Sequence, residues 1–259
     1  MAHYQATIEY DGTDFHGFQR QRGVRTVQAV LEAEVGRLQG GAPVQVRGAG
    51  RTDSGVHATG QVIAFELRWR KDEAALHHAL TTQLPEDVTV RQLARCSERF
   101  HPRYDALSRR YRYTILNTPH RQALLRRTTL HEPQPLDERA MDEAARRLVG
   151  EHDFATFGRP MREGGPTVRR MIAARVARDG DLIHIELEAN AFLFRMVRSL
   201  VGALIPIGRG EQSPAWMAEL LAARDRTLVP PVVAPQGLCL VAVRYEWGSP
   251  EADRSLETN

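Results

Sequence analysis

Hydrophobic and polar positions follow a repeating order along the first hundred residues. Apolar side chains alternate with polar ones in some segments, as in β-strands, and recur at helical spacing in others. The predicted elements are a strand at 3–11, a helix at 26–38, strands at 43–49 and 61–69, a helix at 72–83 and a strand at 87–94. The pattern therefore predicts the order β-α-β-β-α-β.

The same order returns in the rest of the chain. It predicts a strand at 109–117, a helix at 136–150, strands at 167–177 and 181–189, helices at 191–205 and 213–225, and a strand at 237–247. Residues suited to helix starts precede three of the helices: Thr26, Asp137, and Ser213 followed by Pro214.

Two passes of one order predict an α+β fold with two ferredoxin-like halves. Their sheets would join into one mixed, largely antiparallel platform with a central cleft between the halves. We expect the first half to span residues 1–105 and the second 106–247. The polar tail, residues 248–259, has no periodicity and is expected to be disordered.

Composition narrows the class of protein. The 259 residues are 42% hydrophobic and 26% charged, and Arg195 and Arg198 interrupt the longest apolar stretches. The N-terminus lacks the regions of a signal peptide, so we expect a cytoplasmic protein. Cys96 and Cys239 lie far apart and without a CxxC partner, and no HExxH occurs, so neither a disulfide framework nor a metal site is predicted.

Nearly all positive charge comes from arginine. Lys71 is the single lysine among 35 basic residues. Coding bias in a GC-rich genome would explain this, and so would contact with nucleic acid, because guanidinium groups fit phosphates and stack on bases. Arginines alternate with tyrosines at 95–104 and 109–113, which favours nucleic acid without excluding a solvated surface.

The segment 48–62, GAGRTDSGVHATGQV, predicts a loop around one acid, Asp53. It has four glycines and leads into a strand, so it is neither a dinucleotide fingerprint nor a P-loop. Two interpretations remain from local chemistry. Asp53 either caps a tight turn by accepting backbone N–H groups or serves as a functional carboxylate where the halves meet.

Several segments in order resemble the TruA family of tRNA pseudouridine synthases. They are YDGTDFHGFQRQ at 10–21, TVQAVLEAEV at 26–35, GAGRTDSGVHATGQV at 48–62, FHPRYDALSRRYRYTI at 100–115, FLFRMVRSLVG at 192–202 and APQGLCLVAVRY at 234–245. The resemblance implies isomerisation of uridine to pseudouridine at positions 38 to 40 of the tRNA anticodon stem-loop. It implies no cofactor or metal, and a homodimer that binds one tRNA with both subunits.

The resemblance also implies roles for five residues. Asp53 would be the catalytic aspartate, acting as nucleophile or base, and Arg198 its charged partner. Tyr111 would stack on the target base, Arg51 would help to extrude the nucleotide, and Leu238 would form part of the apolar wall of the pocket.

Other residues of these motifs receive other interpretations. We interpret His57 as an anchor of the loop rather than an acid, and Tyr113 as core. Phe18, Pro102 and Tyr104 depart from the family pattern. Arg195 stands where the family often has His or Asn, which predicts an additional phosphate contact.

Two other functions stay open from the sequence. A non-catalytic RNA-binding module would explain the arginines and tyrosines but gives Asp53 and Arg198 no purpose. A small-molecule glycosidase would explain an acid in a cleft but usually needs a second carboxylate, which the loop lacks.

Overall fold

One ten-stranded sheet runs through residues 1–246, the part of the chain that the computed structural model describes. Its main path has the order β4-β1-β3-β10-β5-β9-β8-β7, with β2 beside β3 and β6 beside β5. The strands are β1 (Ala2–Tyr10), β2 (Arg47–Gly48), β3 (His57–Leu67), β4 (Val88–Arg95), β5 (Ser108–Leu116), β6 (Leu130–His131), β7 (Gly150–Asp153), β8 (Val168–Asp179), β9 (Leu182–Ala189) and β10 (Leu238–Arg244).

Five α-helices accompany the sheet in the described part. They are α1 (Val27–Arg37), α2 (Glu73–Gln83), α3 (Glu138–Arg146), α4 (Met196–Gly208) and α5 (Trp216–Ala223). Two predicted caps are confirmed: the Thr26 hydroxyl accepts the N–H of Ala29 at the start of α1, and the Asp137 carboxylate accepts two N–H groups at the start of α3. No helix in residues 1–246 is long and apolar enough to cross a membrane.

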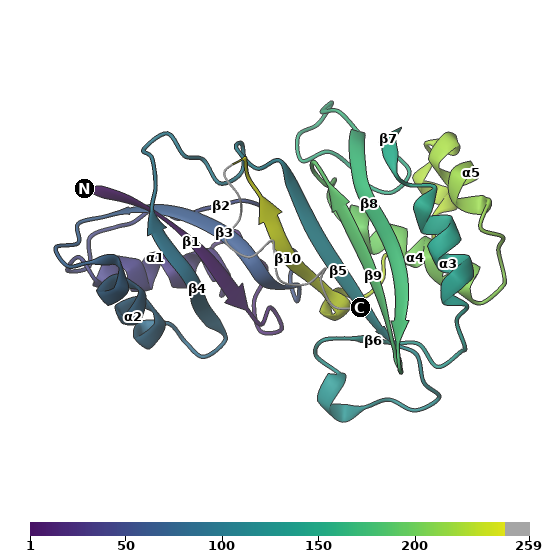
Figure 1. Cartoon of the computed structure of the whole chain (residues 1–259), viewed down its shortest axis with the longest axis horizontal. Helices are drawn as coiled ribbons and strands as arrows, with labels where there is room; N and C mark the ends of the chain where they lie inside the picture. The colour runs from purple at the N-terminus through teal and green to yellow at the C-terminus, as the bar shows by residue number, and fades with distance from the viewer. Residues whose placement is uncertain (247–259) are drawn as a thin grey trace.

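The order of strands repeats in the two parts of the sheet. In the first part of the sheet the strands lie side by side in the order β4, β1, β3, β2. In the second part they lie in the order β10, β5, β9, β8, which is the same arrangement when β10 is counted as the fourth strand of that part. Strand β10 pairs antiparallel with β5 and parallel with β3, and it lies between them in Figure 1. The predicted α+β fold with a joined mixed sheet is confirmed, and the last strand of the chain makes the join.

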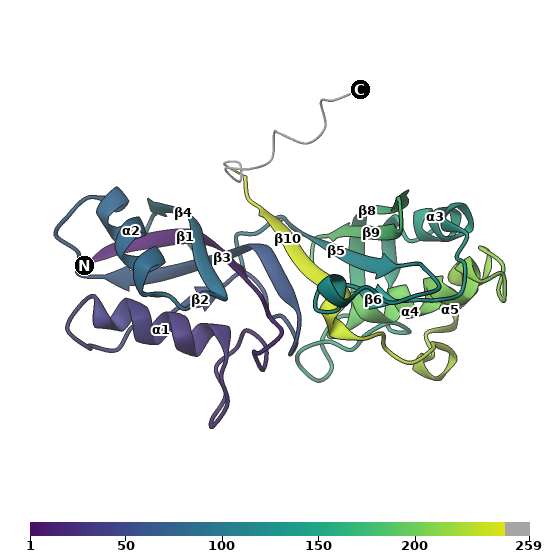
Figure 2. The ribbon, with the colours of Figure 1, turned by 90° about the horizontal axis from the view of Figure 1, so that it is seen from below.

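Helix α4 is the most deeply buried helix of the second part of the sheet and carries Arg198. It lies below the sheet in Figure 2, as α1 does. All of its residues except Arg198 and Pro206 are buried. Because the helix is apolar on nearly every side, it must be buried. Arg198 is therefore a charged side chain on an otherwise buried helix.

Several predicted boundaries were wrong. Helix α4 begins at Met196 instead of residue 191, because Arg195 adopts a left-handed backbone conformation, with φ of 61°, that no α-helix continues through. The strand after the Asp53 loop begins at His57, four residues before its predicted start. Helix α5 has Ala215 at its N-cap instead of Ser213.

Short edge strands account for the remaining errors. Only Arg47–Gly48 of the strand predicted at 43–49 forms ladder pairs. The helix predicted at 136–150 ends at Arg146, and Gly150–Asp153 forms the unpredicted strand β7, whose sequence GEHD has no apolar alternation. The division of the chain near residue 105 stays a prediction, and the predicted disordered tail lies outside the described residues.

Strands β3 and β10 approach each other closely at Gly60, and this contact can be tested. A side-chain carbon on Gly60 would overlap the carbonyl oxygen of Val241 in β10 and lie 2.7 Å from its carbonyl carbon. Gly60→Ala should lower the free energy of unfolding by about 3 kcal/mol, because two backbones would have to separate. Urea unfolding measures this, with Thr59→Ala at the exposed neighbour as the control. Equal stability of the two variants would show that the strands are not so tightly joined.

Candidate active site

A cleft with a volume of about 730 Å³ opens where the two parts of the sheet meet. Its walls come from the loop before β3, from β5, from the start of β10 and from the segment that leads into α4. Within residues 1–246, five arginines and one carboxylate line it: Arg51, Arg103, Arg109, Arg195, Arg198 and Asp53. The cleft is strongly positive, and its single acid lies among cations.

The Asp53 loop is held by contacts to the turn after β1. The backbone N–H of Phe18 donates to the carbonyl of Thr52 at 3.1 Å, and the Thr52 hydroxyl lies 2.8 Å from that of Tyr10. The Ser54 hydroxyl donates to the Phe15 carbonyl at 3.1 Å. These bonds fix the backbone on both sides of Asp53 without using its carboxylate.

His57 anchors the same loop, in agreement with its interpretation from the sequence. Its Nδ1 accepts the backbone N–H of Gly12 at 3.1 Å, so its Nε2 carries the proton and donates to the Arg127 carbonyl at 2.8 Å. Both ring nitrogens contact backbone groups, and Nδ1 also lies 3.1 Å from the Asp11 carboxylate. Neither is available to act as an acid in the cleft.

Arg198 lies 3.0 Å from Asp53, joined through Nη1 and Oδ2. Its Nε also donates to the Val233 carbonyl at 2.7 Å, which fixes the plane of the guanidinium. The side chains of Arg198 and Asp53 are 11% and 25% exposed. The pair is thus shielded enough for the attraction to be strong, while part of the carboxylate still faces the cleft.

Tyr111 lies on β5 and lines the cleft. Its ring packs edge-on against Phe192, with centroids 5.1 Å apart. Burial raises the pKa of the Tyr111 phenol to about 12, although the Arg109 cation opposes the shift. The phenol is therefore neutral at every physiological pH.

Arg51 and Leu238 also line the cleft. Leu238 is buried at the start of β10 and pairs in register with Tyr113, whose side chain is fully buried as expected. Arg51 is exposed, and within residues 1–246 its side chain has no hydrogen bond or ion pair. The cleft therefore brings together all five residues singled out from the sequence.

Sequence reasoning missed Arg109. This guanidinium is buried and donates to four backbone carbonyls: Ala49, Arg103, Ala106 and Asn190. The acceptors come from the Asp53 loop, the crossing between the halves and the segment before α4, so one side chain ties the walls of the cleft together. Burial lowers the pKa of Arg109. The signal was its position two residues before Tyr111 and four before Tyr113, which places all three on one face of the strand.

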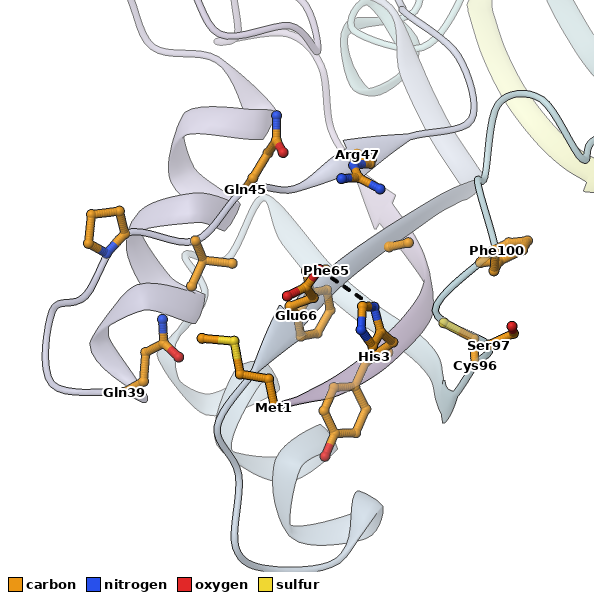
Figure 3. A pocket seen from close by; sticks show the side chains of 14 residues that line it. Met1, His3, Gln39, Gln45, Arg47, Phe65, Glu66, Cys96, Ser97 and Phe100 are labelled. Atoms are coloured by element: carbon orange, nitrogen blue, oxygen red, sulfur yellow. Dashed lines mark ion pairs between the residues drawn. The ribbon is translucent and has the colours of Figure 1, made fainter.

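A second pocket, of about 200 Å³, lies in the first part of the sheet (Figure 3). It contains the His3 and Glu66 pair, 3.7 Å apart, and the Cys96 thiol. Burial raises the pKa of Cys96 to about 11, so the thiol stays protonated. None of the five site residues lies here. Within residues 1–246, no three His, Cys, Asp or Glu side chains are grouped as a metal ion would require.

Comparison with known proteins identifies the family. The family model described as tRNA pseudouridine synthase matches residues 6–105 and 144–246, which is more than half of the chain. The tRNA pseudouridine synthase A of Klebsiella pneumoniae is 43% identical over 92% of this chain and 88% of its own. That of Xanthomonas campestris is 42% identical over 95% of this chain and 97% of its own. The chain therefore belongs to the tRNA pseudouridine synthase family.

Proposed function

We propose that this isomerase converts uridine to pseudouridine at positions 38 to 40 of the tRNA anticodon stem-loop, with Asp53 as the reacting group. Family membership supports the reaction and the tRNA substrate. The assignment of the site rests on one carboxylate, the only one that lines the cleft in the described part of the chain, which pairs with Arg198 among four further arginines. The stem-loop positions follow from the resemblance of the sequence motifs alone.

The reaction exchanges one bond to the ribose for another. The C1′–N1 glycosidic bond breaks, the uracil turns while it stays bound, and a C5–C1′ bond forms. C5 loses its proton and N1 gains one, so the atoms balance. An ionised carboxylate has three possible first steps: addition to the uracil ring, attack on C1′, or removal of the 2′ proton of the ribose. All three use the carboxylate of Asp53, whose Oδ2 lies 3.0 Å from Nη1 of Arg198.

The other residues of the cleft would hold the turning base. A base stacked on Tyr111 gains about 1–3 kcal/mol and is free to rotate in its own plane, which a rigid set of hydrogen bonds would prevent. Leu238 supplies apolar wall. Arg51 would occupy the space that an extruded nucleotide leaves in the RNA stem, and its exposed side chain, unpaired within residues 1–246, supports this role.

We also propose that the enzyme is a cytoplasmic homodimer. Its two cysteines are free, and a reducing compartment maintains such thiols. A second subunit would extend the basic surface along the RNA beyond what one chain offers.

Asp53→Asn should abolish formation of pseudouridine, because the amide keeps the shape of the carboxylate without its charge. Affinity for anticodon stem-loop RNA should stay within about threefold, since one side chain contributes little to the phosphate contacts that dominate binding. Nucleoside chromatography after incubation with RNA measures product. The control is Asp179→Asn, an exposed acid on β8. Turnover by the Asp53 variant would remove the carboxylate from the reaction.

Arg198→Met should slow the reaction by about 100-fold or more, the usual scale for losing a preorganised charge in an active site. It should also lower the free energy of unfolding by about 1–3 kcal/mol, because the Val233 carbonyl loses its donor. Arg209→Met is the matched control. Arg209 pairs with Glu132 at 2.6 Å just beyond the end of α4, so its loss should affect stability but not rate. Equal rates in both variants would refute the assignment of Arg198.

Tyr111→Ala should weaken RNA binding by about 10-fold through lost stacking, whereas Tyr111→Phe should bind within about twofold of wild type. The raised pKa of Tyr111 keeps the phenol protonated up to about pH 12. The pH dependence of turnover between pH 7 and 10 should therefore have the same shape in wild type and Tyr111→Phe. A fall in wild-type activity near pH 9 that disappears in the Phe variant would contradict this, because it would report a phenolate forming well below that value.

A further inference from the structure

Two arginines pack on Phe194, an aromatic side chain that lines the cleft. The guanidinium carbons of Arg195 and Arg159 lie 4.9 Å and 5.1 Å from the centroid of Phe194. The N–H of Phe194 also donates to the carbonyl of Arg159 at 3.0 Å, in an isolated β-bridge. The loop after β7 and the segment before α4 are thereby joined, and their two cations are held close to the same side chain.

No acid neutralises these cations in the described part of the chain. Within residues 1–246, neither the Arg159 nor the Arg195 side chain has an ion pair or a hydrogen bond, and both residues are exposed. Many other arginines here do have acidic partners, such as Arg178 with Glu138. A cation with no counter-charge attracts an anion, so each guanidinium is available to bind one.

The backbone at Arg195 is held in a conformation that arginine rarely adopts. Its φ of 61° lies in the left-handed region, where the side-chain carbon crowds the backbone. Strained residues persist where the surroundings impose the conformation, and they concentrate at functional sites. Arg195 is the N-cap residue of α4, three residues before Arg198. It also lines the cleft itself.

We propose that Arg159 and Arg195, held by Phe194, bind a backbone phosphodiester of the RNA strand beside the nucleotide whose base occupies the cleft. This rests on the proposed function, because it takes RNA as the ligand of the cleft. A phosphodiester fits because forked guanidinium groups bind two phosphate oxygens at once, and exposed side chains can reach a strand on the surface. The site positions the strand and does not touch the reacting atoms.

We expect Arg195→Gln and Arg159→Gln each to weaken binding of anticodon stem-loop RNA by about 5- to 10-fold at low salt. In a plot of log affinity against log salt concentration, the slope should become shallower by about 0.7 to 0.9, the amount expected for one lost phosphate contact. The loss should fall mainly on KM. Arg70→Gln is the control, because Arg70 is exposed, lies before α2 and does not line the cleft. Affinity and salt slope equal to those of Arg70→Gln would overturn the proposal.

Arg195→Gly separates the side chain from the strained backbone. Glycine adopts a φ of 61° freely, so this variant should melt at the same or a higher temperature than wild type. It should nonetheless lose as much RNA affinity as Arg195→Gln. Wild-type affinity in a folded Arg195→Gly variant would show that the guanidinium binds nothing.

Stem-loops with a single neutral methylphosphonate linkage locate the phosphate. At one linkage near the target uridine, the neutral group should weaken binding by wild type but should not weaken binding by Arg195→Gln any further. If the losses of affinity from the substitution and from the neutral linkage add fully at every linkage, the proposal is overturned. If wild type binds the RNA but makes no pseudouridine, the proposed function fails while these binding results still decide the phosphate site. If wild type does not bind the RNA, both fail.

Discussion

The ion pair between Asp53 and Arg198 is the interaction on which the site depends. It joins a loop of the first part of the sheet to the one charged position of the buried helix α4. A guanidinium on such a helix is costly to bury without a partner, and a carboxylate in a sheltered cleft is costly to keep charged. The attraction between the two charges offsets the free-energy cost of removing each from water. The pair holds a charged acid at the floor of a cleft that is otherwise basic.

The fold is organised to bring these two groups together. Strand β10, the last in the chain, pairs with β5 on one side and β3 on the other, so the two parts of the sheet meet without a gap. Arg109 then bonds the carbonyls of Ala49 and Asn190 across the same junction. Hydrogen bonds from a charged donor are stronger than those between neutral groups, and these bonds keep the loop of Asp53 and the approach to α4 in register.

The sequence predicted the layout well because its strands and helices have clear periodicity, and because Thr26 and Asp137 signal helix starts. It failed where conformation is set by distant contacts. The left-handed backbone of Arg195 delays α4, and no local pattern predicts a positive φ at arginine. The resemblance named Asp53, Tyr111 and Arg198, and the structure brings them into one cleft. Arg109 was not predicted as a site residue because its partners are backbone carbonyls, and every residue type has one.

The central claim is that this cleft performs chemistry at C5 of a bound uridine, beyond holding RNA. Release of tritium from anticodon stem-loop RNA labelled at C5 of its uridines tests it directly, because the C5 proton must leave when the new bond to C1′ forms. We expect tritium to be released when uridine occupies positions 38 to 40, and none to be released when cytidine replaces it there. Stable binding of the labelled RNA with no release from any uridine would contradict the account and leave a protein that only binds RNA.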